Sequence, residues 1–223
     1  MWRDALVVAG KDLRIELRSR VLLNQVVPFA LLVLVMFAFA LGPSRQPMIE
    51  AAAGVFWVAL LFASVLGVQR SSALEAPEGT RDGLRMSGLD PAGVFLGKCA
   101  ALALQLVVLE LLLALGVVLF FGAHVRSAGP MIAACAAGTA GLAAVGTLYG
   151  MLASGLRVRE TLLPFLLLPV VAPVLLAGTR AWQSSLGTGT IGGSGPWLEL
   201  LVVFAAVYLV LGVVIYGPLL EAT

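Results

Sequence analysis

The sequence predicts an all-α, polytopic membrane protein with six transmembrane helices and an amphipathic interfacial helix at its N-terminus. First, 61% of the 223 residues are hydrophobic and only 12% are charged, whereas soluble domains average roughly 45–50% apolar and about 25% charged residues. Second, the apolar residues gather in stretches of about 20, the length that a helix needs to cross a bilayer. The mean hydropathy of +1.05 agrees with both observations. The bilayer must therefore be the main solvent of this chain.

The predicted spans divide the whole chain into one transmembrane domain, residues 1–223, with two longer connections. To within a few residues, the spans are Val21–Gly42, Met48–Val68, Leu96–Gly122, Pro130–Leu156, Thr161–Gly178 and Trp197–Gly217. The longer connections are Gln69–Phe95 and Thr179–Pro196. All other connections are short.

Residues 1–20 contain too many charges to cross a bilayer and are expected to form a surface helix. With 3.6 residues per turn, one side of this helix is apolar: Trp2, Leu6, Ala9, Leu13 and Leu17. The opposite side is basic: Arg3, Lys11, Arg14 and Arg18. Val7, Val8 and Ile15 interrupt the pattern. A basic amphipathic segment next to a spanning helix is typical of a helix that lies in the membrane surface and contacts lipids.

The fourth span is rich in small residues, including Gly138, Gly141, Gly146 and Gly150. Small residues allow helices to approach closely in a membrane, and Gly146 and Gly150 match the GxxxG pattern. Two interpretations remain open, packing within one chain and a seam between two chains.

The fifth span contains three prolines, Pro164, Pro169 and Pro173. Each removes a backbone donor and clashes with the preceding turn. We therefore expect this span to be irregular or broken.

The distribution of Lys and Arg predicts the orientation, because cytoplasmic loops carry an excess of both. If both termini are cytoplasmic, eleven basic residues lie inside: Arg3, Lys11, Arg14, Arg18, Arg20, Arg70, Arg81, Arg85, Lys98, Arg157 and Arg159. Only Arg45, Arg126 and Arg180 lie outside. The long Gln69–Phe95 connection is then cytoplasmic as well.

The sequence contains no recognisable catalytic, cofactor-binding or metal-binding constellation. Its one histidine, His124, falls in a short outside loop, and Cys99 and Cys135 fall in apolar stretches that suit packing residues. There is no GxxxxGK[ST] phosphate loop, so the chain itself does not hydrolyse a nucleotide by that route. The net charge of +2 is too small to suggest nucleic acid as a partner. We expect a transport subunit rather than an enzyme.

Glu110 is the intramembrane residue that needs an explanation, because it lies near the middle of the third span. A carboxylate at that depth costs about 2.5–3.5 kcal/mol on insertion scales. Its carboxyl group must therefore contact a polar partner, line a water-filled cavity, or be protonated. A packing hydrogen bond between helices and a role in proton coupling are both open interpretations.

The Gln69–Phe95 connection carries most of the polar side chains between spans, and its charges are mixed: Glu75, Glu78, Arg81, Asp82, Arg85 and Asp90. With glycines at 79, 83 and 88, it suggests one or two short surface helices. A solvated loop would fit the composition equally well.

Several motifs resemble the CcmB-type haem exporter permease of the cytochrome c maturation system, within the ABC-2 class of ABC-transporter permeases. The similar runs are Glu78–Leu84 and Asp90-Pro91 in the long connection and Leu96-Gly97-Lys98 at the start of the third span. The opening run Lys11–Arg20 and the proline-containing run Leu166–Gly178 also resemble this family. The resemblance covers nearly the whole chain. Members usually carry a proline near position 88, where this chain has Gly88.

The resemblance implies a permease subunit of an inner (cytoplasmic) membrane complex that serves haem delivery for c-type cytochrome biogenesis. ATP would be bound by a separate ATPase subunit of the CcmA type, which would contact the coupling loop, residues 69–95. Haem would be the possible cargo, and other cytochrome c maturation membrane subunits would be partners. Two permease chains, as a homodimer, would match two ATPase sites. Two alternatives stay open: an ABC-2 permease for another hydrophobic or lipidic substrate, and a small proton-coupled transporter centred on Glu110.

Overall fold

The computed structural model describes residues 1–20, 22–42, 44–74, 88–154, 159–188 and 193–222. These residues form helices and, within the described ranges, no β-strand. The helices are α1 (Trp2–Ser19), the π-helical turn η1 (Leu22–Val26), α2 (Val27–Ala40), α3 (Arg45–Leu74), α5 (Pro91–Phe121), α6 (Ala128–Ser154), α7 (Arg159–Leu186) and α8 (Gly195–Ala222). Six helical segments, the first formed by η1 and α2 together, are long and apolar enough to cross a membrane. The predicted all-α fold class with six spans is therefore confirmed.

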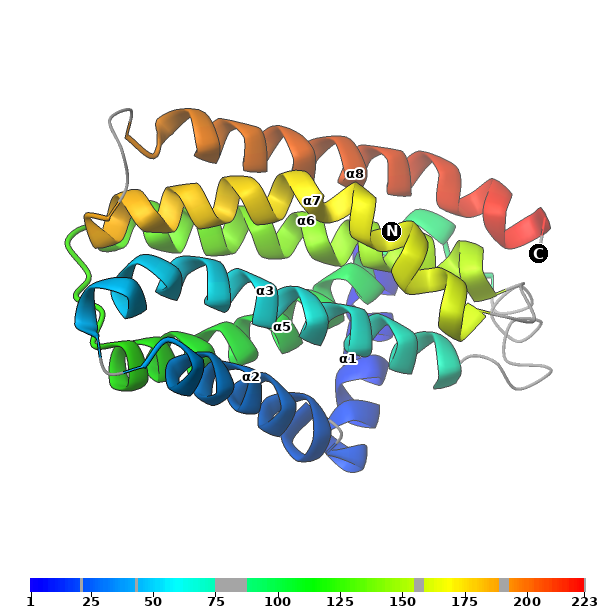
Figure 1. Ribbon diagram of the computed structural model, residues 1–223. Helices are drawn as coiled ribbons and strands as arrows, with labels where there is room; N and C mark the ends of the chain where they lie inside the picture. Colours follow the sequence, from blue (N-terminus) through cyan, green and yellow to red (C-terminus); the bar gives the residue numbers. More distant parts are fainter. Residues whose placement is uncertain (21, 43, 75–87, 155–158, 189–192, 223) are drawn as a thin grey trace.

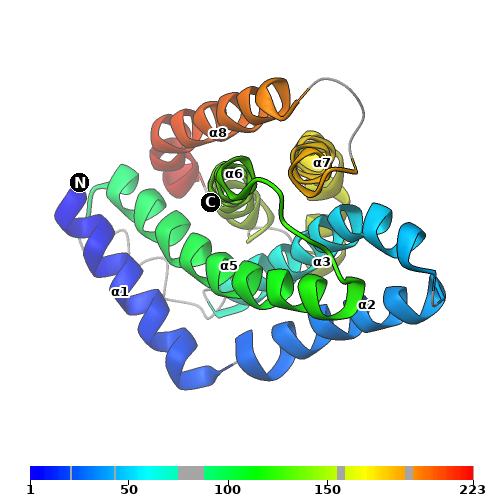
Figure 2. The same cartoon turned by 90° about the vertical axis from the view of Figure 1, so that its left-hand side faces the viewer.

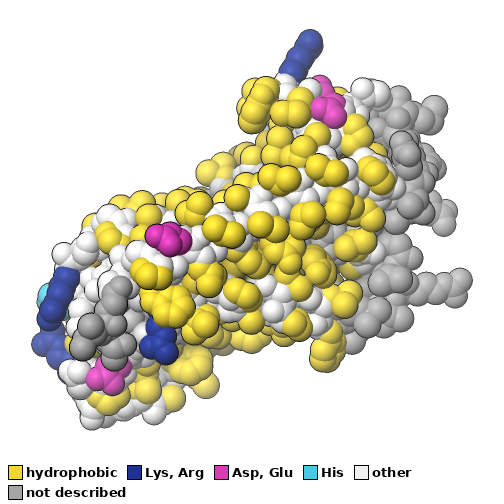
Figure 3. Space-filling model, turned by 90° about the horizontal axis from the view of Figure 1, so that it is seen from above, with side chains coloured by type: hydrophobic (Ala, Val, Ile, Leu, Met, Phe, Trp, Pro, Cys, Tyr) yellow, Lys and Arg dark blue, Asp and Glu magenta, His cyan; other side chains and the backbone are white. Residues whose placement is uncertain are grey.

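The spanning helices form a bundle around α6, which packs against α3, α5, α7 and α8. Figure 2, viewed along the bundle, shows α6 near its middle and α2 at its edge. Hydrophobic side chains dominate the face seen in Figure 3, and few charged side chains interrupt it. This surface is the one expected of helices surrounded by lipid.

The glycines of the fourth predicted span bring α6 close to its neighbours in the same chain. A Cβ atom at Gly138 would lie 2.5 Å from Cη2 of Trp57 on α3. At Gly146 it would lie 2.5 Å from a methyl group of Val68 on α3, and at Gly141 2.9 Å from the Phe204 ring on α8. These close approaches favour packing within one chain over a seam between chains as the role of these three glycines.

The prolines of the fifth span bend α7 but do not break it. One helix, Arg159–Leu186, contains Pro164, Pro169 and Pro173, and its course changes direction in its N-terminal half (Figure 1). The bend agrees with the expected irregularity. The helix also continues past Gly178, so that Ser185, which the sequence places in an outside connection, lies within α7 and is only 2% exposed.

The long connection between the second and third spans is bounded by helices that extend further than hydropathy predicts. α3 continues to Leu74, and α5 begins at Pro91, although residues 69–95 were expected to form the connection. Asp90 caps α5, because its carboxylate accepts a hydrogen bond from the Ala92 backbone N–H at 3.2 Å. Gly88 has φ +65°, a conformation that proline cannot adopt.

Candidate functional site

The first helix, α1, lies across the bundle and packs along the N-terminal part of α5 (Figures 1 and 2). Its apolar stripe does not make this contact, since Trp2 is 72% exposed and Leu6 and Leu17 are exposed as well. Instead, Ala5 and Val8 are buried against α5, with Val8 only 4% exposed. The stripe is thus free to contact lipid, as an interfacial helix requires. The side of α1 that packs against α5 was not predicted, although Val8, an apolar residue outside the stripe, was an indication of a second apolar contact.

Two glycines at the start of α5 allow the backbones of α1 and α5 to touch. A Cβ atom at Gly93 would lie 2.6 Å from the Met1 carbonyl oxygen, and one at Gly97 would lie 2.6 Å from the Ala5 carbonyl oxygen. The Gly97 position would also crowd Val8, whose Cβ would be 2.8 Å away. Any larger residue at either position must displace α1.

An ion pair joins the same two helices. The Lys98 ammonium lies 3.9 Å from a carboxylate oxygen of Asp12, and the other oxygen of Asp12 lies 2.9 Å from the Lys11 ammonium. Lys98, which the sequence predicts at the cytoplasmic end of the third span, is the eighth residue of α5 and is only 6% exposed. Asp12 thus pairs with a basic residue of its own helix and with one of α5. Two of the motifs that carry the family resemblance, Lys11–Arg20 and Leu96-Gly97-Lys98, thus lie next to each other in space.

Carboxylates at the beginning of both helices connect α1 to the end of the long connection. The Asp90 backbone N–H donates a hydrogen bond to the Asp4 carboxylate at 3.4 Å. The Met1 amino group lies 3.1 Å from Asp4 and 3.5 Å from Asp90. The hydrogen bond from this amino group lowers the pKa of the Asp4 carboxyl below its ordinary value. Asp90 is therefore both the cap of α5 and part of its attachment to α1.

A tight elbow joins the other end of α1 to the first span. Arg20 has φ 53°, an uncommon left-handed conformation, and its N–H donates to the Glu16 carbonyl at 2.8 Å. The Glu16 carboxylate accepts a second hydrogen bond from the Leu22 N–H at 2.5 Å, at the first residue of η1. These bonds fix the direction in which the chain enters the membrane.

Glu110 lies away from this junction, between α5 and α6. It is buried, and the Thr139 hydroxyl donates a hydrogen bond to its carboxylate at 2.5 Å. This contact is the packing hydrogen bond that one of the two interpretations expected. It gives the carboxylate a partner on a neighbouring helix and accounts for the presence of a polar group at this depth.

The predicted coupling residues are only partly described. Glu75, Glu78, Arg81, Asp82 and Arg85 lie outside the described residues, so their role stays a prediction.

Among the described residues, no group of three or more His, Cys, Asp or Glu side chains could hold a metal ion. His124 is exposed and its Nδ1 lies 2.9 Å from the Gly122 carbonyl oxygen. The candidate site is the α1–α5 junction, because α5 begins where the long connection ends.

Comparisons with known proteins agree with the motifs that meet at this junction. A family model described as CcmB protein matches residues 3–219. Heme exporter protein B of Paracoccus denitrificans is 29% identical over 89% of this chain and 88% of its own length. The protein of the same name from Pseudomonas aeruginosa is 29% identical over 90% of each chain. That from Bradyrhizobium diazoefficiens is 30% identical over 91% of this chain and 90% of its own. The chain belongs to the CcmB protein family.

Proposed function

We propose that this chain is the permease subunit of an ABC-type complex that delivers haem for c-type cytochrome biogenesis, driven by a separate ATPase subunit. The observation that carries the proposal is the family match across residues 3–219, together with relatives named heme exporter protein B. The chain has no phosphate loop, so energy from ATP must arrive through contact with another protein.

The coupling residues are Glu75, Glu78, Arg81, Asp82, Arg85 and Asp90, in the connection between α3 and α5. Closure of an ATPase dimer against this connection would move α5, because the connection leads into the first turn of α5. The α1–α5 junction supports this mechanism. Backbone contacts at Gly93 and Gly97 and the Lys98–Asp12 ion pair hold α1 to α5. A push on the connection would therefore tilt two helices as one rigid unit.

The open alternatives differ from the proposal in what they require. The proton-coupled reading needs Glu110 to exchange protons, whereas its hydrogen bond with Thr139 supports a packing role. A permease for another hydrophobic substrate shares the coupling mechanism and differs only in cargo. The homodimer, and the inner-membrane location with both termini cytoplasmic, stay predictions.

Charge reversal in the connection tests the coupling to an ATPase. The variant Glu78→Lys with Asp82→Lys would place like charges opposite a basic surface of the ATPase, at a cost of several kcal/mol if the contacts are buried. The tagged variant should accumulate in the membrane at normal levels but no longer co-purify with the ATPase subunit. The neutral variant Glu78→Gln with Asp82→Asn is the matched control and should retain part of the binding. Unchanged co-purification of the charge-reversed variant would show that these residues do not couple the chain to an ATPase.

A further inference from the structure

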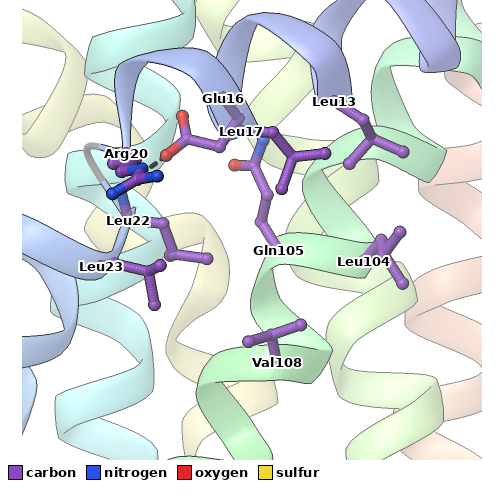
Figure 4. A pocket seen from close by; sticks show the side chains of 9 residues that line it. All are labelled: Leu13, Glu16, Leu17, Arg20, Leu22, Leu23, Leu104, Gln105 and Val108. Carbon is purple, nitrogen blue, oxygen red and sulfur yellow. Dashed lines mark hydrogen bonds between the residues drawn. The ribbon is translucent and has the colours of Figure 1, made fainter.

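A groove opens on the outside of the bundle, where α1 turns into the first span (Figure 4). Its volume is about 450 Å³. It lies between α1, η1 and α5 and is lined by Leu13, Glu16, Leu17, Arg20, Leu22, Leu23, Leu104, Gln105 and Val108. Leu104 is 49% exposed, and Leu17 and Leu23 are exposed too. The groove is therefore open toward the lipid that surrounds the helices.

Most of the lining suits a hydrocarbon chain. Six of the nine residues are Leu or Val, and they come from all three helical elements. Because the acyl chain would come from equally apolar lipid, van der Waals contact rather than the hydrophobic effect would hold it there. An acyl chain from the adjacent leaflet would fill the groove without any rearrangement of the bundle.

The remaining lining residues are polar and lie where a lipid has its polar part. The Arg20 guanidinium is exposed at the elbow, and no carboxylate among the described residues forms an ion pair with it. The Glu16 carboxylate accepts a hydrogen bond from the Leu22 backbone N–H. The Gln105 amide points toward α1 in Figure 4 and has no hydrogen-bond partner within the described ranges. The groove thus offers a cation, a carboxylate that already accepts a hydrogen bond, and an amide beside an apolar surface.

We propose that this groove binds one anionic phospholipid, with an acyl chain on the leucines and the phosphate beside Arg20. The Gln105 amide would donate to an ester carbonyl of the same lipid. Haem does not fit the lining equally well, because none of the nine residues is His, Cys, Met or Tyr, the usual iron ligands. The bound lipid would stabilise the elbow between α1 and the first span. This inference does not depend on the proposed function.

A second groove, beside the N-terminal half of α1, provides the internal control. Its lining is apolar apart from the thiol of Cys99 and includes Trp2, Leu6, Leu96 and Leu209. It has a similar volume, about 400 Å³, but no cation. It should accept acyl chains without any preference for the headgroup.

Native mass spectrometry of the purified full chain in detergent tests the proposal, with phosphatidylglycerol and phosphatidylcholine of identical acyl chains as probes. The wild-type chain should retain phosphatidylglycerol preferentially. Arg20→Gln should weaken its binding about fivefold, the equivalent of ~1 kcal/mol per basic residue near an anionic surface. Arg20→Lys should keep the preference, because it keeps the charge. Arg45→Gln, at an exposed arginine of α3 outside the groove, should leave the binding of phosphatidylglycerol unchanged.

A bulky residue in the groove tests its role separately from the headgroup. Leu104→Trp should reduce retention of both lipids, and Leu209→Trp in the second groove should not reduce the preference for phosphatidylglycerol. Val108→Phe serves as a second groove variant if Leu104→Trp does not fold. Equal retention of the two lipids by the wild-type chain would overturn the proposal. Displacement of phosphatidylglycerol by added haem, lost in Arg20→Gln, would overturn it in favour of a haem site.

Discussion

The backbone contact between α1 and α5 lets us predict how strongly Gly97→Ala destabilises the docking of α1 on α5. A Cβ atom at this position would lie 2.6 Å from the Ala5 carbonyl oxygen, about 0.8 Å closer than the 3.4 Å at which ordinary contact begins. The clash is with backbone, which cannot rotate away as a side chain can. Overpacking of this kind costs about 1–3 kcal/mol, which corresponds to a roughly 5- to 150-fold larger population of undocked α1.

The thiol reactivity of a Val8→Cys reporter measures this population directly. Val8 is 4% exposed while α1 is docked, so a maleimide reaches a cysteine at this position only after α1 lifts away. The measurement uses purified chain in which Cys99 and Cys135 are replaced by alanine. Gly97→Ala should raise the labelling rate about 5- to 150-fold.

Gly67→Ala in α3 is the matched control for this experiment. Its Cβ atom would lie 3.4 Å from a Leu102 methyl group, which is an ordinary contact. In a helix interior, alanine is otherwise favoured over glycine by up to about 1 kcal/mol. The control should therefore leave the labelling rate of the reporter unchanged. Equal labelling rates in Gly97→Ala and Gly67→Ala would refute the close packing of α1 on α5.

Two further predictions concern orientation and the intramembrane carboxylate. Gly10 and Gly129 are exposed, and a Cβ atom at either meets nothing within 4 Å. An impermeant thiol reagent applied to intact cells should therefore label Gly129→Cys and not Gly10→Cys, and the opposite pattern would reverse the predicted orientation. Glu110→Gln should keep an acceptor for the Thr139 hydroxyl and leave protein level and activity near normal, whereas Glu110→Ala leaves that hydroxyl unpaired at a cost of about 1–3 kcal/mol. Loss of activity in Glu110→Gln at a normal protein level would instead favour proton coupling.

Hydropathy predicts the spans well because every helix that crosses a bilayer must have about 20 mostly apolar residues and few charges. It predicts helix ends less well. α3 continues to Leu74 and α7 to Leu186 through polar residues, because a helix can extend beyond the hydrocarbon and ends at caps and turns. Asp90 as the cap, followed by Pro91 in the first turn, is a sequence pattern typical of a helix start. It marks the start of α5 more accurately than the first apolar run does.

The α1–α5 junction could not be predicted from polarity alone. Lipid and protein interior are both apolar, so the lipid-facing stripe of α1 and its buried residues Ala5 and Val8 look alike in a sequence. Lys98 is buried beside Asp12, whereas a basic residue near the end of a span is usually expected at the surface. The small residues Gly93 and Gly97 are the local sign of close approach, but only Gly97 was considered in the prediction from sequence, as part of a family motif.

Haem attachment in cells that lack this chain tests the central claim most directly. Deletion of the chain should abolish covalent haem on c-type cytochromes, measured by haem staining of denaturing gels, while proteins that bind haem non-covalently keep it. The wild-type chain supplied on a plasmid should restore staining. Normal haem staining of c-type cytochromes in the deletion strain would contradict the proposed function.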